Sequence, residues 1–227
     1  MAGRERIRAR PAALERALDD LGVRAADRDR PNSAEDLVLL RRGLRDVPDL
    51  ERVGRGEDQR LHRYSLKDVL SCLPKGEQIR EGDVVILYTG WDRYNWTKPT
   101  RDDVTYFDRH PGPMPEVCDY LVEKKIRWLG GDLASMDHSL YVRVRYFRPD
   151  LVKEYEAQTG KPIDETLPMK DFEHVHYHMA KANVPMLENL GGELAEVAGR
   201  RVDVGAFPWR WIGGEGCICR VAAFMDR

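Results

Sequence analysis

The sequence has few cysteines, a net charge close to zero and no long apolar run. Its 227 residues include four cysteines and carry a formal net charge of −2. So few cysteines exclude a disulfide-built scaffold, and the near-neutral charge gives no electrostatic footprint for nucleic acid. No stretch approaches the roughly 18 apolar residues of a membrane span. No apolar segment follows the charged N-terminus, as a secretory signal would require. We therefore expect a cytoplasmic protein that binds neither nucleic acid nor membrane.

Aromatic residues are missing from the first 60 positions. This stretch holds 14 arginines and 13 acidic residues but no lysine, histidine or cysteine, and all 19 aromatic residues follow it. A segment of this kind has little with which to build its own packed core. We expect residues 1–60 to be a helical or poorly ordered segment, with short amphipathic helices at 12–21 and 33–44.

Residues 61–227 alternate predicted strands with predicted helices and form the expected body of the protein. Buried or alternating apolar runs predict strands at 83–89, 126–129, 184–187, 201–207 and 217–224. Helical spacing of apolar residues predicts helices at 114–125 and 174–182. The pattern indicates an α/β (α+β) fold with a mixed β-sheet. A long polar stretch with several prolines marks an insertion near 148–171.

The densest group of chemically active side chains is a run of three histidines. His174, His176 and His178 alternate along the chain, and Glu188 follows the predicted strand at 184–187. On a helix His174 and His178 would share a face at a spacing that suits a metal; on a strand all three would share one. A carboxylate beside these imidazoles would form half of a metal or acid–base site. The alternative is that the histidines are surface or capping residues.

Polar residues also follow two other predicted strands. Asp132, Ser135 and Asp137 come after the strand at 126–129 and its two glycines, and Trp91 follows the strand at 83–89. Ligands favour the carboxyl ends of strands in open α/β sheets, so these four residues are candidates to line a substrate pocket. Alternatively, Ser135 and Asp137 cap a helix and Trp91 only closes the core.

Four stretches, taken in order, resemble one known family. They are EGDVVILYTGW at 81–91, WLGGDLASMD at 128–137, His176 with VPMLENL at 184–190, and FPWR at 207–210 with GEGCICRVAAF at 214–224. In this combination the sequence resembles the metal-dependent cyclase family, which includes bacterial arylformamidases (kynurenine formamidases) and isatin hydrolase.

This resemblance implies a swivelling β/β/α-type fold in a homo-oligomer, a dimer or a tetramer. It implies a hydrolase that cleaves a cyclic amide or an aryl-formamide, as in tryptophan catabolism, with a bound divalent zinc or manganese ion. By motif match, His176 and Glu188 correspond to the family's C-terminal His/Glu pair near the metal. They are therefore the candidate catalytic and metal-binding residues.

The family's main metal motif, His-x-Gly-Thr-His-x-Asp-x-Pro-x-His, is absent from this sequence. Only His62 precedes His110, and residues 1–60 stand where the motif would lie. We therefore expect a domain that is incomplete at the N-terminus and a hydrolase with impaired activity. The alternative is an inactive homologue that binds a small molecule or an intact partner subunit. A rearranged or out-of-frame segment would explain both the missing motif and the unusual composition.

Overall fold

The computed structural model describes residues 36–40, 61–209, 212–214 and 216–225. In chain order, the strands are β1 (Asp36–Leu40), β2 (Arg63–Tyr64), β3 (Val84–Leu87), β4 (Gly112–Pro113), β5 (Trp128–Gly131), β6 (Met186–Leu187), β7 (Arg201–Pro208) and β8 (Cys219–Phe224). The α-helices are α4 (Leu66–Ser71), α5 (Asp103–Asp108), α6 (Pro115–Glu123), α7 (Val144–Phe147), α8 (Pro149–Thr159), α9 (Ile163–Thr166), α10 (His174–Lys181) and α11 (Leu194–Val197). Three short 3-10 helices are η1 (Trp91–Tyr94), η2 (Ser139–Tyr141) and η3 (Met169–Asp171). The predicted helix at 12–21 lies outside the described residues.

A mixed six-stranded sheet forms the centre of the protein, in the order β6-β5-β3-β1-β7-β8. The first four of these strands run parallel to one another. β7 runs antiparallel to β1, and β8 runs antiparallel to β7. All four residues of β3 are buried, as the unbroken apolar run at this position predicts for a strand covered on both faces. The structure therefore confirms the predicted α/β fold with a mixed sheet.

The helix predicted at 33–44 is wrong, because residues Asp36–Leu40 form strand β1. This strand pairs in parallel with β3, with Leu37 opposite Val84, and antiparallel with β7, with Leu37 opposite Val202. A short apolar run is ambiguous between helix and strand when only its spacing is considered. Here the pairing with β3 and β7, which are distant in the sequence, makes the segment a strand.

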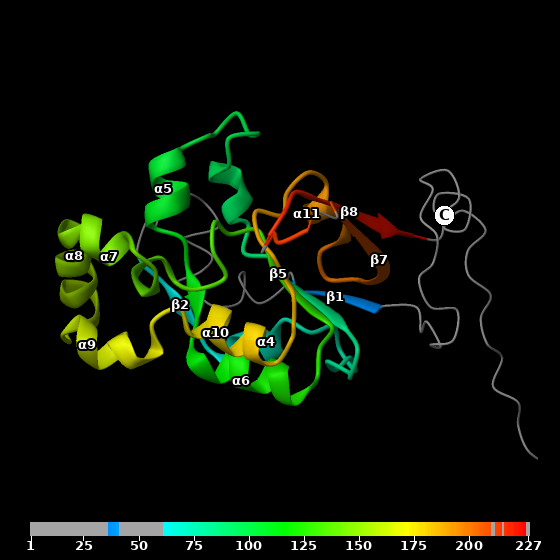
Figure 1. Cartoon of the computed structure of the whole chain (residues 1–227), viewed down its shortest axis with the longest axis horizontal. Helices are drawn as coiled ribbons and strands as arrows, with labels where there is room; N and C mark the ends of the chain where they lie inside the picture. The colour runs from blue at the N-terminus through cyan, green and yellow to red at the C-terminus, as the bar shows by residue number, and fades with distance from the viewer. Residues whose placement is uncertain (1–35, 41–60, 210–211, 215, 226–227) are drawn as a thin grey trace, which may run out of the picture.

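Helices α4, α6 and α10 cover one face of the sheet and lie side by side (Figure 1). Val85 and Leu87 of β3 point into this layer, where they pack with residues such as Leu121 of α6 and Met179 of α10. Val84 and Ile86 point to the opposite face, toward α11 and β7. The predicted helices at 114–125 and 174–182 are thus confirmed as α6 and α10.

The predicted insertion at 148–171 is largely helical and forms α8, α9 and η3 (Figure 1). Leu151 and Tyr155 of α8 are buried against Leu61 and Tyr141. Arg109 and Glu154 add a bidentate ion pair, in which both nitrogen–oxygen distances are 2.7 Å. This lobe is therefore packed onto the body by its own small apolar cluster.

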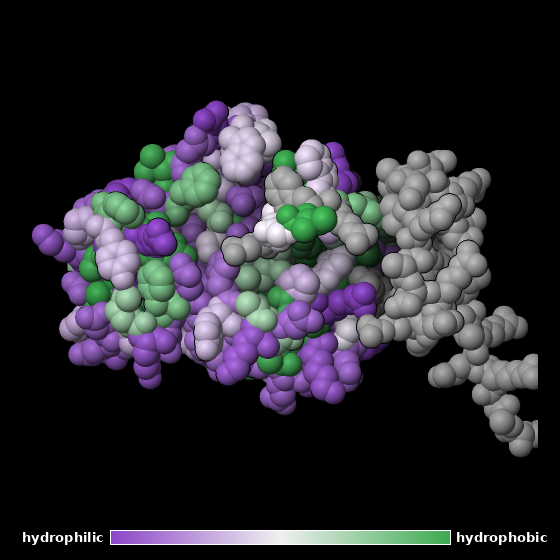
Figure 2. All heavy atoms as spheres, in the orientation of Figure 1, coloured by the Kyte–Doolittle hydropathy of each residue, from purple (hydrophilic) through white to green (hydrophobic). Residues whose placement is uncertain are grey.

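Most residues on the face shown in Figure 2 are hydrophilic in the region over α4, α6 and α10. Within the described part of the chain, no helix is long and apolar enough to cross a membrane.

Candidate active site

Three neighbouring parallel strands end at the same edge of the sheet, and each is followed by a polar residue. Thr89 follows β3, Asp132 follows β5, and Glu188 follows β6. The predicted strand at 126–129 is observed as β5, displaced by two residues toward the C-terminus, and the predicted strand at 184–187 is observed as the shorter β6, which begins two residues later and ends at the predicted residue. This edge is where open α/β sheets bind their ligands.

Asp132 connects two of these strand ends from a fully buried position. Its Oδ1 accepts hydrogen bonds from the Thr89 backbone N–H at 2.8 Å and the Thr89 hydroxyl at 2.9 Å. Its Oδ2 accepts one from the Asp92 N–H at 3.3 Å. Burial raises the pKa of Asp132 to about 6, although the bonds from Thr89 oppose the shift. Asp132 therefore holds the loops together, and its role in a substrate pocket stays a prediction.

Trp91 lies in the core beside this carboxylate. It has no exposed surface, it packs against Tyr94, Tyr106 and Leu133, and its indole N–H donates to the Tyr106 carbonyl at 3.2 Å. The Tyr106 hydroxyl in turn lies 3.0 Å from Asn189 Oδ1. Trp91 thus closes a small core behind the strand ends, which was the alternative interpretation of this residue.

Asp137 fixes the first turn of α10. Its two carboxylate oxygens accept hydrogen bonds from the backbone N–H groups of Val175, at 2.8 Å, and His176, at 3.1 Å. They satisfy two of the N–H groups that a helix start leaves without partners. Ser135 supports the same loop, because its hydroxyl accepts a hydrogen bond from the Asp137 N–H at 3.2 Å. The expected capping role is therefore present, but the helix that is capped lies more than 30 residues further along the chain.

The imidazole of His176 lies between two carboxylates. Its Nδ1 is 2.7 Å from Asp137 Oδ2, and its Nε2 is 3.3 Å from Glu188 Oε1. Glu188 Oε1 also accepts a hydrogen bond from the Met136 N–H at 2.9 Å. The hydrogen bond to Asp137, with a further contribution from Glu188, raises the pKa of His176 to about 10. The structure thus brings His176, Glu188 and Asp137 together from three separate segments of the chain.

This arrangement fits one half of a metal site. A histidine that binds a metal through one ring nitrogen usually donates the other N–H to a carboxylate, and Asp137 stands in that position toward His176. His176 Nε2 and Glu188 Oε1 would then be the two protein ligands, and the ion would replace the proton on Nε2. A catalytic zinc normally takes three protein ligands. Across the described residues, the group of three donors that lie close together is a different one, formed by Asp119, His174 and His178.

Two buried histidines near this site were not identified from the sequence. His110 and His138 are 1% and 0% exposed. The ring of His110 contacts the Pro111 carbonyl at 3.1 Å, and His138 Nδ1 accepts the Leu140 N–H at 3.1 Å. Burial lowers the pKa of His110 to about 4 and that of His138 well below its usual value. Each is a single histidine with no second histidine or cysteine at a ligand spacing beside it, so no local pattern marks them.

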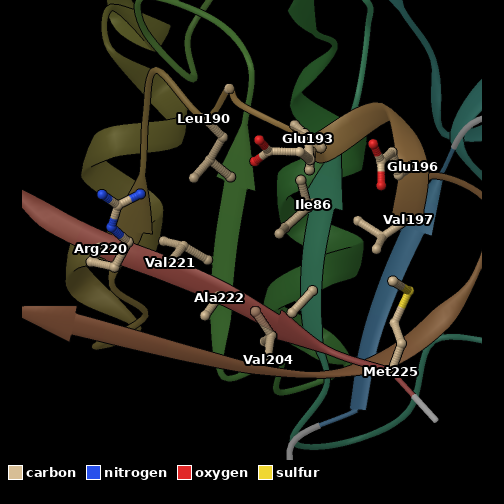
Figure 3. Close-up of a pocket in the computed structure, with 13 residues that line it drawn as sticks. Ile86, Leu190, Glu193, Glu196, Val197, Val204, Arg220, Val221, Ala222 and Met225 are labelled. Carbon is tan, nitrogen blue, oxygen red and sulfur yellow. The ribbon is translucent and has the colours of Figure 1, made fainter. Parts of the chain in front are cut away.

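A cavity of about 360 Å³ lies on the other face of the sheet (Figure 3). The side chains of Ile86, Leu190, Val204 and Val221 give it an apolar floor, while Glu193 and Arg220 lie at its border. Ile86 points away from the face that α10 covers. This cavity is therefore separate from the His176–Glu188 pair.

Solved structures with this fold include two isatin hydrolases. An isatin hydrolase bound to the product analogue thioisatinate is 17% identical, with a TM-score of 0.56 over 85% of this chain and 60% of its own. Isatin hydrolase A from Labrenzia aggregata is 18% identical, with a TM-score of 0.55 over 85% and 61%. A structure described as a novel cyclase is 16% identical, with a TM-score of 0.52 over 84% and 53%. None of the curated proteins compared with the chain matches it.

The chain spans about 60% of the length of the isatin hydrolases whose fold it shares. Within the chain, residues 46–138 match the Cyclase family model, described as "Putative cyclase". The chain therefore has the fold of isatin hydrolase, and residues 46–138 of it are similar to the Cyclase family.

Proposed function

We propose that this domain hydrolyses the carbon–nitrogen bond of a cyclic amide or an aryl-formamide. The observation that carries the proposal is the position of His176, which is held by Asp137 on one side and faces Glu188 on the other. Asp137 and Glu188 both follow strands at the edge of the sheet where open α/β folds bind their ligands. The domain has the fold of isatin hydrolase.

The side chains around His176 have separate roles in this proposal. Asp137 is buried and fixes the orientation of the imidazole, so that Nε2 is the nitrogen turned toward Glu188. Glu188 is partly exposed, with 29% of its side chain accessible, and can accept a proton from a water molecule that approaches from the solvent. A divalent ion, zinc or manganese, would supply a hydroxide at neutral pH and would polarise the substrate carbonyl.

The described residues contribute two of the ligands that such an ion needs, and the sequence lacks the family's main metal motif. Since metal affinity and catalysis depend on the same preorganised ligands, we expect this chain to be a slow hydrolase. The same observation favours a second candidate function, that of an inactive homologue which binds a small amide or pairs with another subunit. In both cases the proposed setting is a cytoplasmic homo-oligomer, a dimer or a tetramer.

The test is an assay of N-formylkynurenine and isatin hydrolysis by the full chain, first stripped of metal and then supplied with zinc or manganese. Metal-dependent turnover that is lost in Glu188→Gln but kept in Glu116→Gln would support the hydrolase. Glu116 is an exposed carboxylate on α6, so it controls for the change of charge.

Binding of the intact substrates, measured by calorimetry without turnover, would support the second candidate instead. Turnover on the order of 1 per second or more would overturn the expectation of impaired activity. Neither turnover nor binding would reject both functions.

A further inference from the structure

Helix α10 carries two further imidazoles, which point away from His176. His174 and His178 are one helical turn apart, and their rings stack with centroids 4.0 Å apart. Side chains two positions apart on a helix project about 200° from one another, so His176 faces the site described above while its two neighbours face α6. There both histidines meet Asp119.

The distances among these three side chains are too long for hydrogen bonds but short enough for one ion to bridge them after small side-chain adjustments. His174 Nε2 and His178 Nδ1 each lie 3.6 Å from Asp119 Oδ1. All three donor atoms lie within 4.8 Å of one another. A separation of 3.6 Å is too long for a hydrogen bond, whereas two ligands of a tetrahedral zinc ion lie about 3.3 Å apart at ordinary metal–ligand distances. Small side-chain adjustments would bring the three atoms onto one ion.

The buried histidine of the group provides an independent observation. His174 is only 9% exposed, and its Nε2 is a buried atom without a hydrogen-bond partner. Buried polar atoms are normally satisfied, and each exception calls for a specific explanation. This nitrogen points toward the Asp119 carboxylate, and a bound cation would lie between the two groups. An ion at this point would give the atom its missing partner.

We propose that Asp119, His174 and His178 form a second metal site, which binds one divalent transition-metal ion with water as the fourth ligand. Two imidazoles and one carboxylate favour zinc, cobalt, nickel or copper over magnesium and calcium, which prefer oxygen ligands. Asp119 is largely exposed, with 60% of its side chain accessible, so the ion has an open route of entry. Because Asp119 belongs to α6 and both histidines belong to α10, the ion would fasten the two helices together.

The full, untagged chain is first treated with a chelator and then titrated with Co²⁺. Zn²⁺ is added last, to displace the bound Co²⁺. The absorption bands of tetrahedral cobalt report coordination directly. We expect binding to weaken at least about tenfold in Asp119→Asn and in His178→Gln, as the loss of one ligand requires. Glu116→Gln, which changes an exposed carboxylate on the same helix, should bind as the wild type does. Glu188→Gln, which alters only the other site, should still bind Co²⁺ through Asp119, His174 and His178.

A second measurement needs no variant. Nitrogen-15 spectra of the histidine side chains, recorded with and without Zn²⁺, should show His174 Nε2 and His178 Nδ1 shifting together while His110 and His138 stay unchanged. The proposal is overturned if the wild type does not bind Co²⁺, or if Asp119→Asn and His178→Gln bind it unchanged. It is equally overturned if Glu188→Gln abolishes binding or if the resonances of these two nitrogens do not move.

Discussion

Asp137 and His176 are joined through both the backbone and the ring. The Asp137 carboxylate accepts the His176 backbone N–H at 3.1 Å and contacts the imidazole Nδ1 at 2.7 Å. A single buried side chain therefore fixes both the start of α10 and the orientation of the histidine that the helix carries. The geometry of the candidate site and the stability of the helix depend on the same contacts.

Asp137→Asn should lower the free energy of unfolding by about 2–4 kcal/mol, since an amide nitrogen would replace one buried acceptor and face two N–H groups. Urea denaturation measures the change. Asp150→Asn is the matched control, because Asp150 is an exposed partner of Arg148 and surface pairs contribute at most about 1 kcal/mol. Equal stability of the two variants would contradict the role given to Asp137.

Activity should depend on the two residues that face each other at 3.3 Å, His176 and Glu188. If the chain hydrolyses either substrate with added metal, His176→Ala and Glu188→Ala should each lower kcat/KM by at least about 100-fold, because each removes a proposed metal ligand. Far-ultraviolet circular dichroism should show that both variants keep the fold. If kcat/KM falls by less than about tenfold in both variants, His176 and Glu188 do not carry the reaction.

Stability at mildly acidic pH should depend on His110. Its pKa is lowered to about 4 by burial, so between pH 6.5 and 4 the unfolded chain binds a proton that the folded protein does not. Folding stability from this group is therefore complete above pH 6.5 and falls as the pH drops, by up to about 1.4 kcal/mol per pH unit.

His110→Asn should remove this loss. The measurement is the difference in unfolding free energy between wild type and variant at pH 7, 6 and 5. The difference is used because Asp132, whose pKa is raised to about 6, acts in the opposite direction over part of this range. A difference that does not change with pH would contradict the prediction.

Gly112→Ala should be strongly destabilising, by about 3 kcal/mol or more. A Cβ atom at this position would lie 2.3 Å from the Cα and backbone nitrogen of His138, so the backbone itself would have to move. At Gly191 the same substitution meets nothing within 4 Å and should change stability by less than about 0.5 kcal/mol. Thermal unfolding of the two variants measures the contrast, and similar melting temperatures would show that the loop before η2 adapts.

The sequence predicted those parts of the fold in which the local pattern and the tertiary environment agree. The apolar run of β3 is buried on both faces, and the helical spacing of α6 and α10 matches the faces that they bury. The prediction failed at β1, where four apolar residues fit either a helix or a strand and distant partners decided.

The candidate site shows the same division. The spacing of His176 and Glu188 was available from the resemblance, and both residues meet in the structure. Asp119 was not available, because its relation to His174 and His178 exists only after α6 packs on α10. A linear pattern can show that two histidines share a helix face, but it cannot show which carboxylate the neighbouring helix will place opposite them.

The central position of β1 has a consequence for the order in which the sheet is completed. β1 pairs with β3 on one side and with β7 on the other, so the edge that it offers to β7 stays open until residues near the end of the sequence have been synthesised. Pairings between such distant segments slow folding, and an open strand edge can recruit another chain. Nascent or C-terminally shortened molecules should therefore associate with one another through β1, whereas molecules that have added β7 and β8 should not.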